Sequence, residues 1–322
     1  MTGARLLHMG GAVVDYLYRI AELPPRGGES VATRHARLPG GGINQMAAAR
    51  RSGMAVAYGG GHGTGPDGDL LRAAFAEFGI AIIQAANPDV DSGNCVVMTD
   101  DAGERSFVSW PGAEAQLDDA VLSTLQPWVD DWVVVSGYTL SYPSSRDVLA
   151  QWIAGLPPSQ RVVFDPAPVV ASIPPALRDS VLARTTWVSA NLDEARVLTG
   201  EDDPARQADV LLGRLCPSAT GVVLRAGATG CYLQERGKPQ VLAPAFPVEA
   251  VDTNGAGDTH LGVFLACLAQ GEEPQGAVLR ANAAAAIAVT RFGGACAPTA
   301  QEIDSFLADR QNETNNKKIR NA

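Results

Sequence analysis

From residue 112 onward, short apolar segments alternate with segments of helical composition, and this alternation restricts the fold more than any other feature. The expected strands are Trp132–Ser136, Arg161–Asp165, Trp187–Ala190, Gly221–Arg225 and Cys231–Leu233. Strands that alternate with helices build a parallel sheet, because each crossover returns the chain to the same edge. The sequence therefore predicts an α/β fold with a doubly wound, mostly parallel sheet and helices on both of its faces.

The segment before residue 112 has a different pattern. Asn94–Thr99 and Arg105–Trp110 are strand-like, and the polar turn between them predicts a hairpin. The irregular segment after residue 12 suggests further short strands and turns. We expect these pieces, about residues 12–38 and 93–111, to form a small β-sheet lid outside the main sheet.

Length and composition bound the remaining possibilities. A chain of 322 residues can bury a full core, and we expect one domain over residues 1–311. The last helix is expected over Gln301–Arg310, and residues 312–322 form a polar tail that we expect to be mobile. The net charge of −10 argues against nucleic acid or an anionic membrane as a partner. Five dispersed cysteines without a CxxC pair favour a reducing, cytoplasmic location.

One glycine-rich stretch before a predicted helix carries most of the chemical information. Gly255-Ala256-Gly257 lets the backbone turn tightly, and the helix start that follows offers N–H groups and a positive dipole end to an anion. Asp258 lies at the same helix start, where a carboxylate can accept a proton from an alcohol. Asp258 as a simple helix cap is the alternative interpretation. The stretch predicts phosphoryl transfer to a hydroxyl group.

The stretch from Asp252 to Asp258 resembles the second signature of the PfkB carbohydrate kinases, D-T-x-G-A-G-D, at every fixed position. Gly40-Gly41-Gly42-Ile43-Asn44-Gln45 resembles the first signature of that family. The resemblance extends over nearly the whole chain. It implies a ribokinase-like fold and an ATP-dependent kinase that phosphorylates a hydroxymethyl group on a small sugar or sugar-like molecule.

The resemblance also implies roles for the acceptor-side residues. Asp258 would be the catalytic base, with Gly255, Ala256 and Gly257 as the backbone anion hole. The substrate hydroxyls would be held by Asp15, Gly41, Gly42 and Asn44. For Asn44, a helix cap is the alternative, because Asn is a favoured cap residue.

A second set of residues would bind the nucleotide and its cations. Asn191 and Glu194 resemble the pair that orders Mg²⁺-bound water beside ATP, although a helix capping box explains the same spacing. Weaker similarity assigns the nucleotide site to Arg225, Gly227, Gly230 and Asn282. Asp252 would help to bind a monovalent cation, with K⁺ as the candidate.

The acceptor itself is not identified by these motifs. The first signature is one residue short or has Pro39 in place of a glycine, and Gly41 stands where ribokinases carry a lysine. The missing cation puts ribose in doubt and favours a neutral acceptor over a phosphorylated one. A nucleoside kinase of the same family stays open. Paired lid edges in this family suggest a homodimer.

Two functions of other classes compete with a kinase. Gly63-Thr64-Gly65-Pro66-Asp67-Gly68 spells GxGxxG, which alone is weak evidence for a dinucleotide-binding oxidoreductase. A non-catalytic sugar or nucleotide sensor on the same fold is the other alternative, and the presence of both Asp252 and Asp258 argues against it. The chain lacks the P-loop pattern GxxxxGK[ST].

Overall fold

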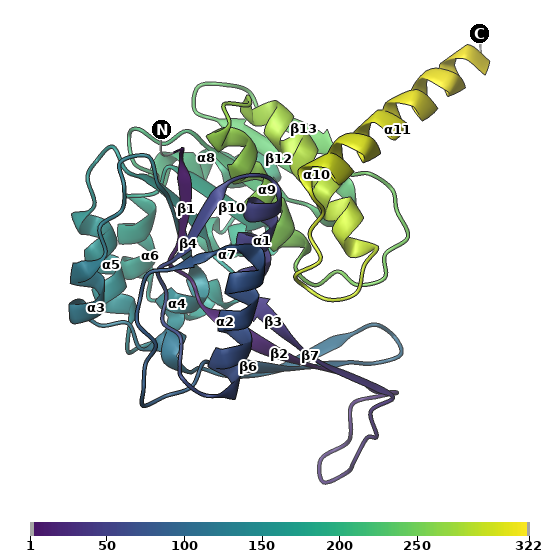
Figure 1. The fold of residues 1–322 in the computed structure, drawn as a ribbon. Helices are drawn as coiled ribbons and strands as arrows, with labels where there is room; N and C mark the ends of the chain where they lie inside the picture. Colours follow the sequence, from purple (N-terminus) through teal and green to yellow (C-terminus); the bar gives the residue numbers. More distant parts are fainter. Residues whose placement is uncertain (1–2, 321–322) are drawn as a thin grey trace.

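The computed structural model describes the backbone of residues 3–320 and the side chains of residues 3–312. Two sheets and their covering helices make up the molecule (Figure 1).

The large sheet has nine strands in the order β13-β12-β11-β10-β9-β8-β1-β4-β5. Its strands are β1 (Arg5–His8), β4 (Ala55–Tyr58), β5 (Ala81–Ile82), β8 (Trp132–Ser136), β9 (Arg161–Asp165), β10 (Trp187–Asn191), β11 (Gly221–Arg225), β12 (Gly230–Glu235) and β13 (Val241–Pro244). Strands β5 to β11 in this order are parallel, whereas β12 and β13 add an antiparallel edge. The mostly parallel α/β fold predicted from the sequence is confirmed.

Helices cover both faces of this sheet, and each face has its own hydrophobic core. One face carries α1 (Ile43–Arg51), α2 (Pro66–Phe78), α9 (Ala256–Ala269), α10 (Pro274–Val289) and α11 (Ala300–Arg320). The other carries α3 (Asp119–Thr124), α4 (Gly137–Ser141), α5 (Arg146–Gly155), α6 (Pro175–Leu182), α7 (Leu192–Thr199) and α8 (Pro204–Arg214). Because both faces are covered, the central strands are continuous apolar runs, as in the fully buried Trp132–Val135.

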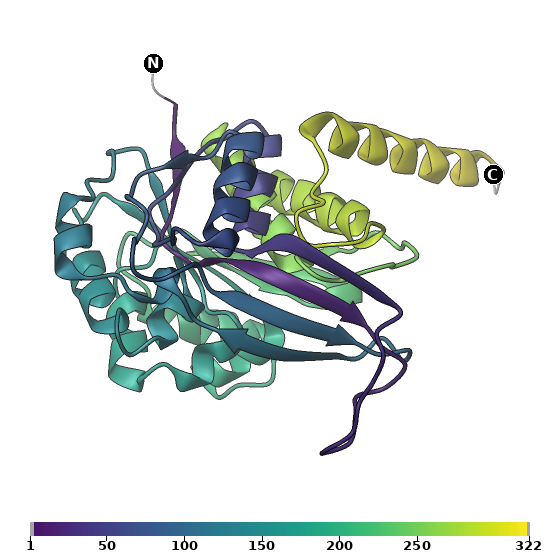
Figure 2. The ribbon, with the colours of Figure 1, turned by 60° about the horizontal axis from the view of Figure 1, so that its bottom comes forward.

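A smaller four-stranded sheet, the lid sheet, has the order β3-β2-β6-β7. Its strands are β2 (Ala12–Arg19), β3 (Arg34–Gly41), β6 (Asn94–Thr99) and β7 (Arg105–Trp110). Figure 2 shows it as a separate layer that extends away from the large sheet. The predicted hairpin matches β6 and β7 at both ends, and β3 continues three residues beyond the expected lid boundary at residue 38.

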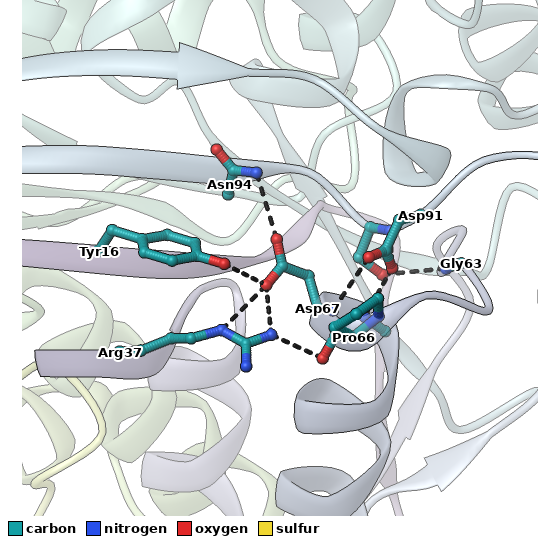
Figure 3. A network of polar contacts seen from close by, with 9 residues as sticks. Tyr16, Arg37, Gly63, Pro66, Asp67, Asp91 and Asn94 are labelled. Atoms are coloured by element: carbon teal, nitrogen blue, oxygen red, sulfur yellow. Dashed lines mark hydrogen bonds and ion pairs between the residues drawn. The ribbon is translucent and has the colours of Figure 1, made fainter.

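Asp67, in the first turn of α2, ties the lid sheet to the body of the protein (Figure 3). Its carboxylate accepts hydrogen bonds from the Tyr16 hydroxyl at 2.8 Å, from Arg37 Nε at 3.1 Å and from Asn94 Nδ2 at 3.2 Å. These three side chains come from β2, β3 and β6. One buried carboxylate therefore fixes the base of three lid strands against one helix end.

Some elements differ from the sequence-based expectations. The short strands β5 and β13 were not predicted. Helix α11 extends to Arg320, well past the predicted end at Arg310, so the backbone of residues 312–320 is helical rather than an irregular tail. The mobility of that segment stays a prediction, and residues 321–322 lie outside the described residues. Within the described chain, no helix combines the length and hydropathy needed to cross a bilayer.

Candidate active site

The glycine turn before α9 has the backbone conformation that its sequence requires. Gly255 precedes the helix with φ +71°, a left-handed conformation that disfavours any residue with a Cβ. Asp252 closes the loop, because its carboxylate accepts hydrogen bonds from the Asn254 N–H at 2.9 Å and the Gly293 N–H at 3.1 Å. Within the described chain, no protein acceptor is bonded to the N–H groups of Gly257 and Asp258, whereas the Ala256 N–H donates to the Thr253 carbonyl at 3.4 Å. The helix start is therefore able to donate to an anion.

Asp258 lies in the first turn of α9, where protein atoms surround its carboxyl group while the residue keeps a part of its surface open to solvent. Burial raises the pKa of Asp258 from 3.8 to about 7, and repulsion by Asp165 and Asp15 acts in the same direction. Attraction to Arg225 and the polar side chain of Asn44 act in the opposite direction. A carboxylate with a pKa near neutrality is matched to accepting a proton at physiological pH.

Asn44 reaches this site from the start of α1. Gly41 has φ +59°, and the Gly42 N–H donates to the Gly11 carbonyl at 2.8 Å, which turns the chain from β3 into the helix. The helix cap is Gly42, so the interpretation of Asn44 as a cap is wrong. The Asn44 side chain instead packs against the loops around Gly255 and Gly294. Its Oδ1 atom is buried without a hydrogen-bond partner within the described chain, which leaves an acceptor for a ligand.

Asp15 reaches the site from the middle of β2. Its side chain is almost fully buried, and burial raises its pKa to about 6, while the side chain of Asn254 acts against this shift. A Cβ atom at Gly40 would lie 2.2 Å from Asp15 Oδ2, so the glycine of the neighbouring strand makes room for the carboxylate. Asp15, Asn44 and Asp258 thus surround the loop at Asn254, a residue that sequence reasoning did not single out.

A second group of charges lies at the carboxyl ends of three neighbouring strands. Asp165 ends β9, Arg225 ends β11, and Glu194 follows β10 in the first turn of α7. Arg225 Nη2 lies 3.4 Å from Glu194 Oε2 and 3.8 Å from Asp165 Oδ1. Burial raises the pKa of both carboxyl groups, whereas Arg225 lowers it. Asp165 was not predicted, although its place at the end of a buried parallel strand is a known signal for a site residue.

The pair Asn191 and Glu194 forms the capping box that was the alternative interpretation. The Asn191 side chain accepts from the Glu194 N–H at 2.8 Å, and Glu194 Oε2 accepts from the Asn191 N–H at 2.8 Å. The cap does not remove Glu194 from the charged group, because the same carboxylate faces Arg225. Arg225 in turn lies beside the start of α9, since a Cβ at Gly257 would be 3.3 Å from its Nε.

The other expected nucleotide residues lie around β13 and the turn before β12. Gly227 and Gly230 have φ +55° and +114°, and a Cβ at Gly230 would lie 2.1 Å from the Ala243 carbonyl oxygen. Asn282 Nδ2 donates to the same Ala243 carbonyl at 2.9 Å, and its Oδ1 lies 3.1 Å from His260 Nε2. Asn282 therefore fastens α10 to β13, and the contact with an adenine ring expected from the sequence stays a prediction.

The GxGxxG stretch at residues 63–68 begins α2 but already holds an anion of the protein itself. The Asp91 carboxylate accepts hydrogen bonds from the N–H groups of Asp67 at 3.0 Å and Gly68 at 2.8 Å. Although burial alone would raise the pKa of Asp91, these N–H donors lower it below its usual value. Asp91 thus occupies the position that a pyrophosphate would take in a dinucleotide-binding fold.

A cavity of about 310 Å³ lies between the lid sheet and the loop before α9. The lid side contributes residues of all four strands or their ends, and the body contributes residues 250–254 and Phe292. Arg105 spans the gap, since its Nη2 donates to Thr253 Oγ1 at 3.1 Å. The cavity therefore begins beside the anion-binding turn and extends along the lid.

Comparisons with known proteins agree with this geometry. The model of the pfkB family carbohydrate kinases matches residues 8–300. An uncharacterized sugar kinase of Escherichia coli, YegV, is 30% identical over 306 residues, with 94% of each chain covered. The ribokinase of Haemophilus influenzae is 32% identical over 275 residues, which cover 83% of this chain and 86% of the relative.

A solved structure shows the same fold. The aminoimidazole riboside kinase of Salmonella enterica, complexed with aminoimidazole riboside and an ATP analog, superposes with a TM-score of 0.76 at 22% identity. The match covers 94% of this chain and 99% of the other.

Proposed function

Because the chain belongs to the pfkB family of carbohydrate kinases, we propose that it transfers the γ-phosphoryl group of MgATP to a hydroxymethyl group of a small sugar-like acceptor. The observation that carries this proposal is Asp258, a carboxyl group in the first turn of α9 whose pKa is raised to about 7 by desolvation. A base with this pKa is half ionised at neutral pH and can remove a hydroxyl proton as the new bond forms.

The proposed step is a direct in-line transfer. The acceptor oxygen loses its proton to the Asp258 carboxylate and forms a bond to the γ-phosphorus, while the bond from that phosphorus to the β,γ-bridging oxygen breaks and ADP leaves. The N–H groups of Gly255, Ala256 and Gly257 would stabilise the negative charge on the equatorial oxygens, although the Ala256 N–H also donates to the Thr253 carbonyl at 3.4 Å. Asp15 and Asn44 would hold the acceptor, since a carboxylate and an amide can bind neighbouring hydroxyl groups. Closure of the lid sheet would exclude water.

The residues present fit a magnesium ion that is bound mainly through water and phosphate. Among the described residues, no cluster of three metal-ligating side chains exists that could hold an ion alone. The carboxyl groups of Asp165, Glu194 and Asp258 nevertheless lie around one cation, Arg225, which leaves a negative excess that suits Mg²⁺. Glu194 and Asp165 would hold its water shell, and the ion would neutralise phosphate charge.

A monovalent cation such as K⁺ remains a narrower proposal at Asp252. Both oxygens of that carboxylate already accept backbone N–H groups, so the ion would be bound beside them by carbonyl oxygens of the loop over residues 291–297. The five cysteines are free thiols, which supports the proposal that the protein acts in the reducing cytoplasm.

The test is an ADP-release assay with MgATP and a panel of pentoses, hexoses, ketoses, sugar acids and nucleosides. Asp258→Asn should lower turnover by ~10²–10⁴ and leave acceptor affinity nearly unchanged. The matched control is Asp309→Asn, which changes an exposed aspartate on α11. Full activity of Asp258→Asn in a folded protein would remove that residue from the mechanism.

The same panel separates the alternatives. Turnover confined to nucleosides would favour a nucleoside kinase, a class to which the superposed riboside kinase belongs. Tight binding of an acceptor without ADP release would favour a sensor. The preference for a neutral acceptor was based on Gly41 alone. The charged side chains of the lid sheet give a second, independent indication of the charge of the acceptor.

A further inference from the structure

Three arginines lie in one row across the lid sheet. Arg34 of β3 pairs with Arg19 of β2, Arg19 pairs with Thr99 of β6, and Thr99 pairs with Arg105 of β7. Paired residues of neighbouring strands project from the same face of a sheet. The four side chains, called here the arginine row, all line the cavity between the lid sheet and the loop before α9.

The arginine row is on the same face of the lid sheet as Asp15. Arg19 follows Asp15 by four residues on β2, and side chains alternate between faces with a period of two. At a rise of about 3.3 Å per residue, the two Cα atoms lie about 13 Å apart along the strand. The three-methylene stem of an arginine can shorten this span by reaching back towards Asp15. Asp15 itself does not line the cavity, but Asn254, whose side chain bonds to Asp15, does. A molecule held by Asp15 at one end can therefore extend past Asn254 and meet the row at its other end.

The charges of the arginine row are poorly compensated by the protein. Arg19 lies 3.6 Å from Asp101, but both side chains are about half exposed or more, and such pairs contribute little. Arg34 stacks at 4.1 Å on the Phe292 ring, which is a neutral partner. Like charges on neighbouring strands repel each other, so the row destabilises the lid sheet unless an anion joins it.

Among the described residues, Asp101 lies outside the cavity lining, and the lining itself adds no carboxylate that is free of hydrogen bonds. Arg105 donates to the neutral Thr253 hydroxyl, and the one carboxylate that lines the cavity, Asp252, accepts two backbone N–H groups. The whole chain carries a net charge of −10, so a local excess of three arginines over one aspartate is a marked reversal. A cationic cavity in an acidic protein concentrates anions at that place.

We propose that the acceptor is itself anionic, with a phosphate or carboxylate group at the end remote from its hydroxymethyl group, bound by Arg19, Arg34 and Arg105. This inference rests on the proposed kinase function and adds the chemical class of its acceptor. Arginine suits the role because its planar guanidinium binds either group through two parallel hydrogen bonds. The row would supply the cationic contact that the first signature lacks at Gly41.

Calorimetric binding to the Asp258→Asn variant tests the proposal without turnover. The probes are D-ribose, D-ribose 1-phosphate and D-ribonate, which share a free hydroxymethyl group and differ in charge at the other end. We expect at least one of the two anions to bind about tenfold or more tightly than ribose. Preference for the phosphate over the carboxylate, or the reverse, identifies which anion the row accepts.

Neutral variants of the row supply the second arm. Arg19→Gln, Arg34→Gln and Arg105→Gln, each added to Asp258→Asn, should weaken binding of the preferred anion about tenfold and leave ribose unchanged. The matched control is Arg26→Gln, an exposed arginine in the loop between β2 and β3 that does not line the cavity. The control should bind all three probes as its parent does.

Three results would overturn the inference. The first is equal affinity for ribose and both anions, and the second is the absence of binding by any probe. The third is a rise in the KM for ATP, rather than for the acceptor, when the row variants are made with Asp258 intact, because the arginines would then serve the nucleotide phosphates. None of these touches the kinase proposal itself, which fails if the wild-type protein releases no ADP with any acceptor of the panel or if Asp258→Asn keeps full ADP release.

Discussion

Asp258 should make the protein less stable as pH rises, and replacing it should remove that penalty. The pKa of Asp258 is about 7 in the folded chain, against an ordinary value of 3.8. Between these two values the folded state keeps a proton that the unfolded state has lost. The stability that this proton contributes is therefore lost as pH rises through the folded pKa.

The size of the change in the free energy of unfolding follows from the pH range between the unfolded and the folded pKa of Asp258. Each pH unit in which one extra proton is bound changes the free energy of unfolding by about 1.36 kcal/mol. From pH 5 to pH 8 the group crosses about two such units, so wild-type protein should lose about 3 kcal/mol from this residue alone. Asp258→Asn has no proton to lose. Its free energy of unfolding, relative to wild type, should therefore rise by about 3 kcal/mol over the same interval.

Urea unfolding followed by circular dichroism at pH 5 and pH 8 measures this difference. Groups that titrate equally in both proteins cancel in the comparison. Asp309→Asn, at an exposed position, should follow wild type at both pH values. A gap between wild type and Asp258→Asn that is the same at pH 5 and pH 8 would refute the reasoning, because the carboxyl group would then have an ordinary pKa.

Three further outcomes are expected. Asp165→Asn removes a repulsion from Asp258 and should move the acidic limb of the kcat/KM profile to lower pH, so an unmoved limb would contradict the coupling. Gly294→Ala places a Cβ 2.5 Å from Asn44 Nδ2 and should raise the acceptor KM several-fold with little change for ATP, whereas unaltered kinetics would show that Asn44 can move freely. The protein should form a homodimer through the lid edge at β7, where Trp110 is 54% exposed, and Trp110→Glu should weaken it in light scattering; a wild-type monomer would exclude this contact.

Much of the fold could be predicted because local patterns there agree with the tertiary structure. The strand over Arg161–Asp165 has three consecutive apolar residues at its centre, and such a run predicts burial on both faces. The hairpin of β6 and β7 was predicted at its true ends because its turn is polar, whereas its strands alternate or run apolar. In contrast, β5 has two residues and β13 has four, too few for a pattern to stand out.

The site was predictable where one short segment carries it, and less so where distant segments meet. The turn from Gly255 to Asp258 holds its own backbone conformation and its own carboxylate, so its chemistry could be stated from adjacent residues. The arginine row could not be predicted from the sequence, because strand register decides which residues face each other across the lid sheet. Asp165 was not predicted for a similar reason, since its role depends on its contacts with Arg225 and Asp258, which lie on other elements.

The two glycine-rich helix starts of this chain differ in one respect that has a wider consequence. At the start of α2, the N–H groups donate to the carboxylate of Asp91, so the protein itself supplies the anion and the turn has a structural role. At α9, in the part of the chain that the structure describes, the protein supplies no such counter-ion to the N–H groups of Gly257 and Asp258. Both loops are glycine-rich turns before a helix, so their glycines alone do not show this difference. A glycine-rich helix start is structural when the protein supplies acceptors for its N–H groups, and it can bind a ligand when those N–H groups have no protein acceptor.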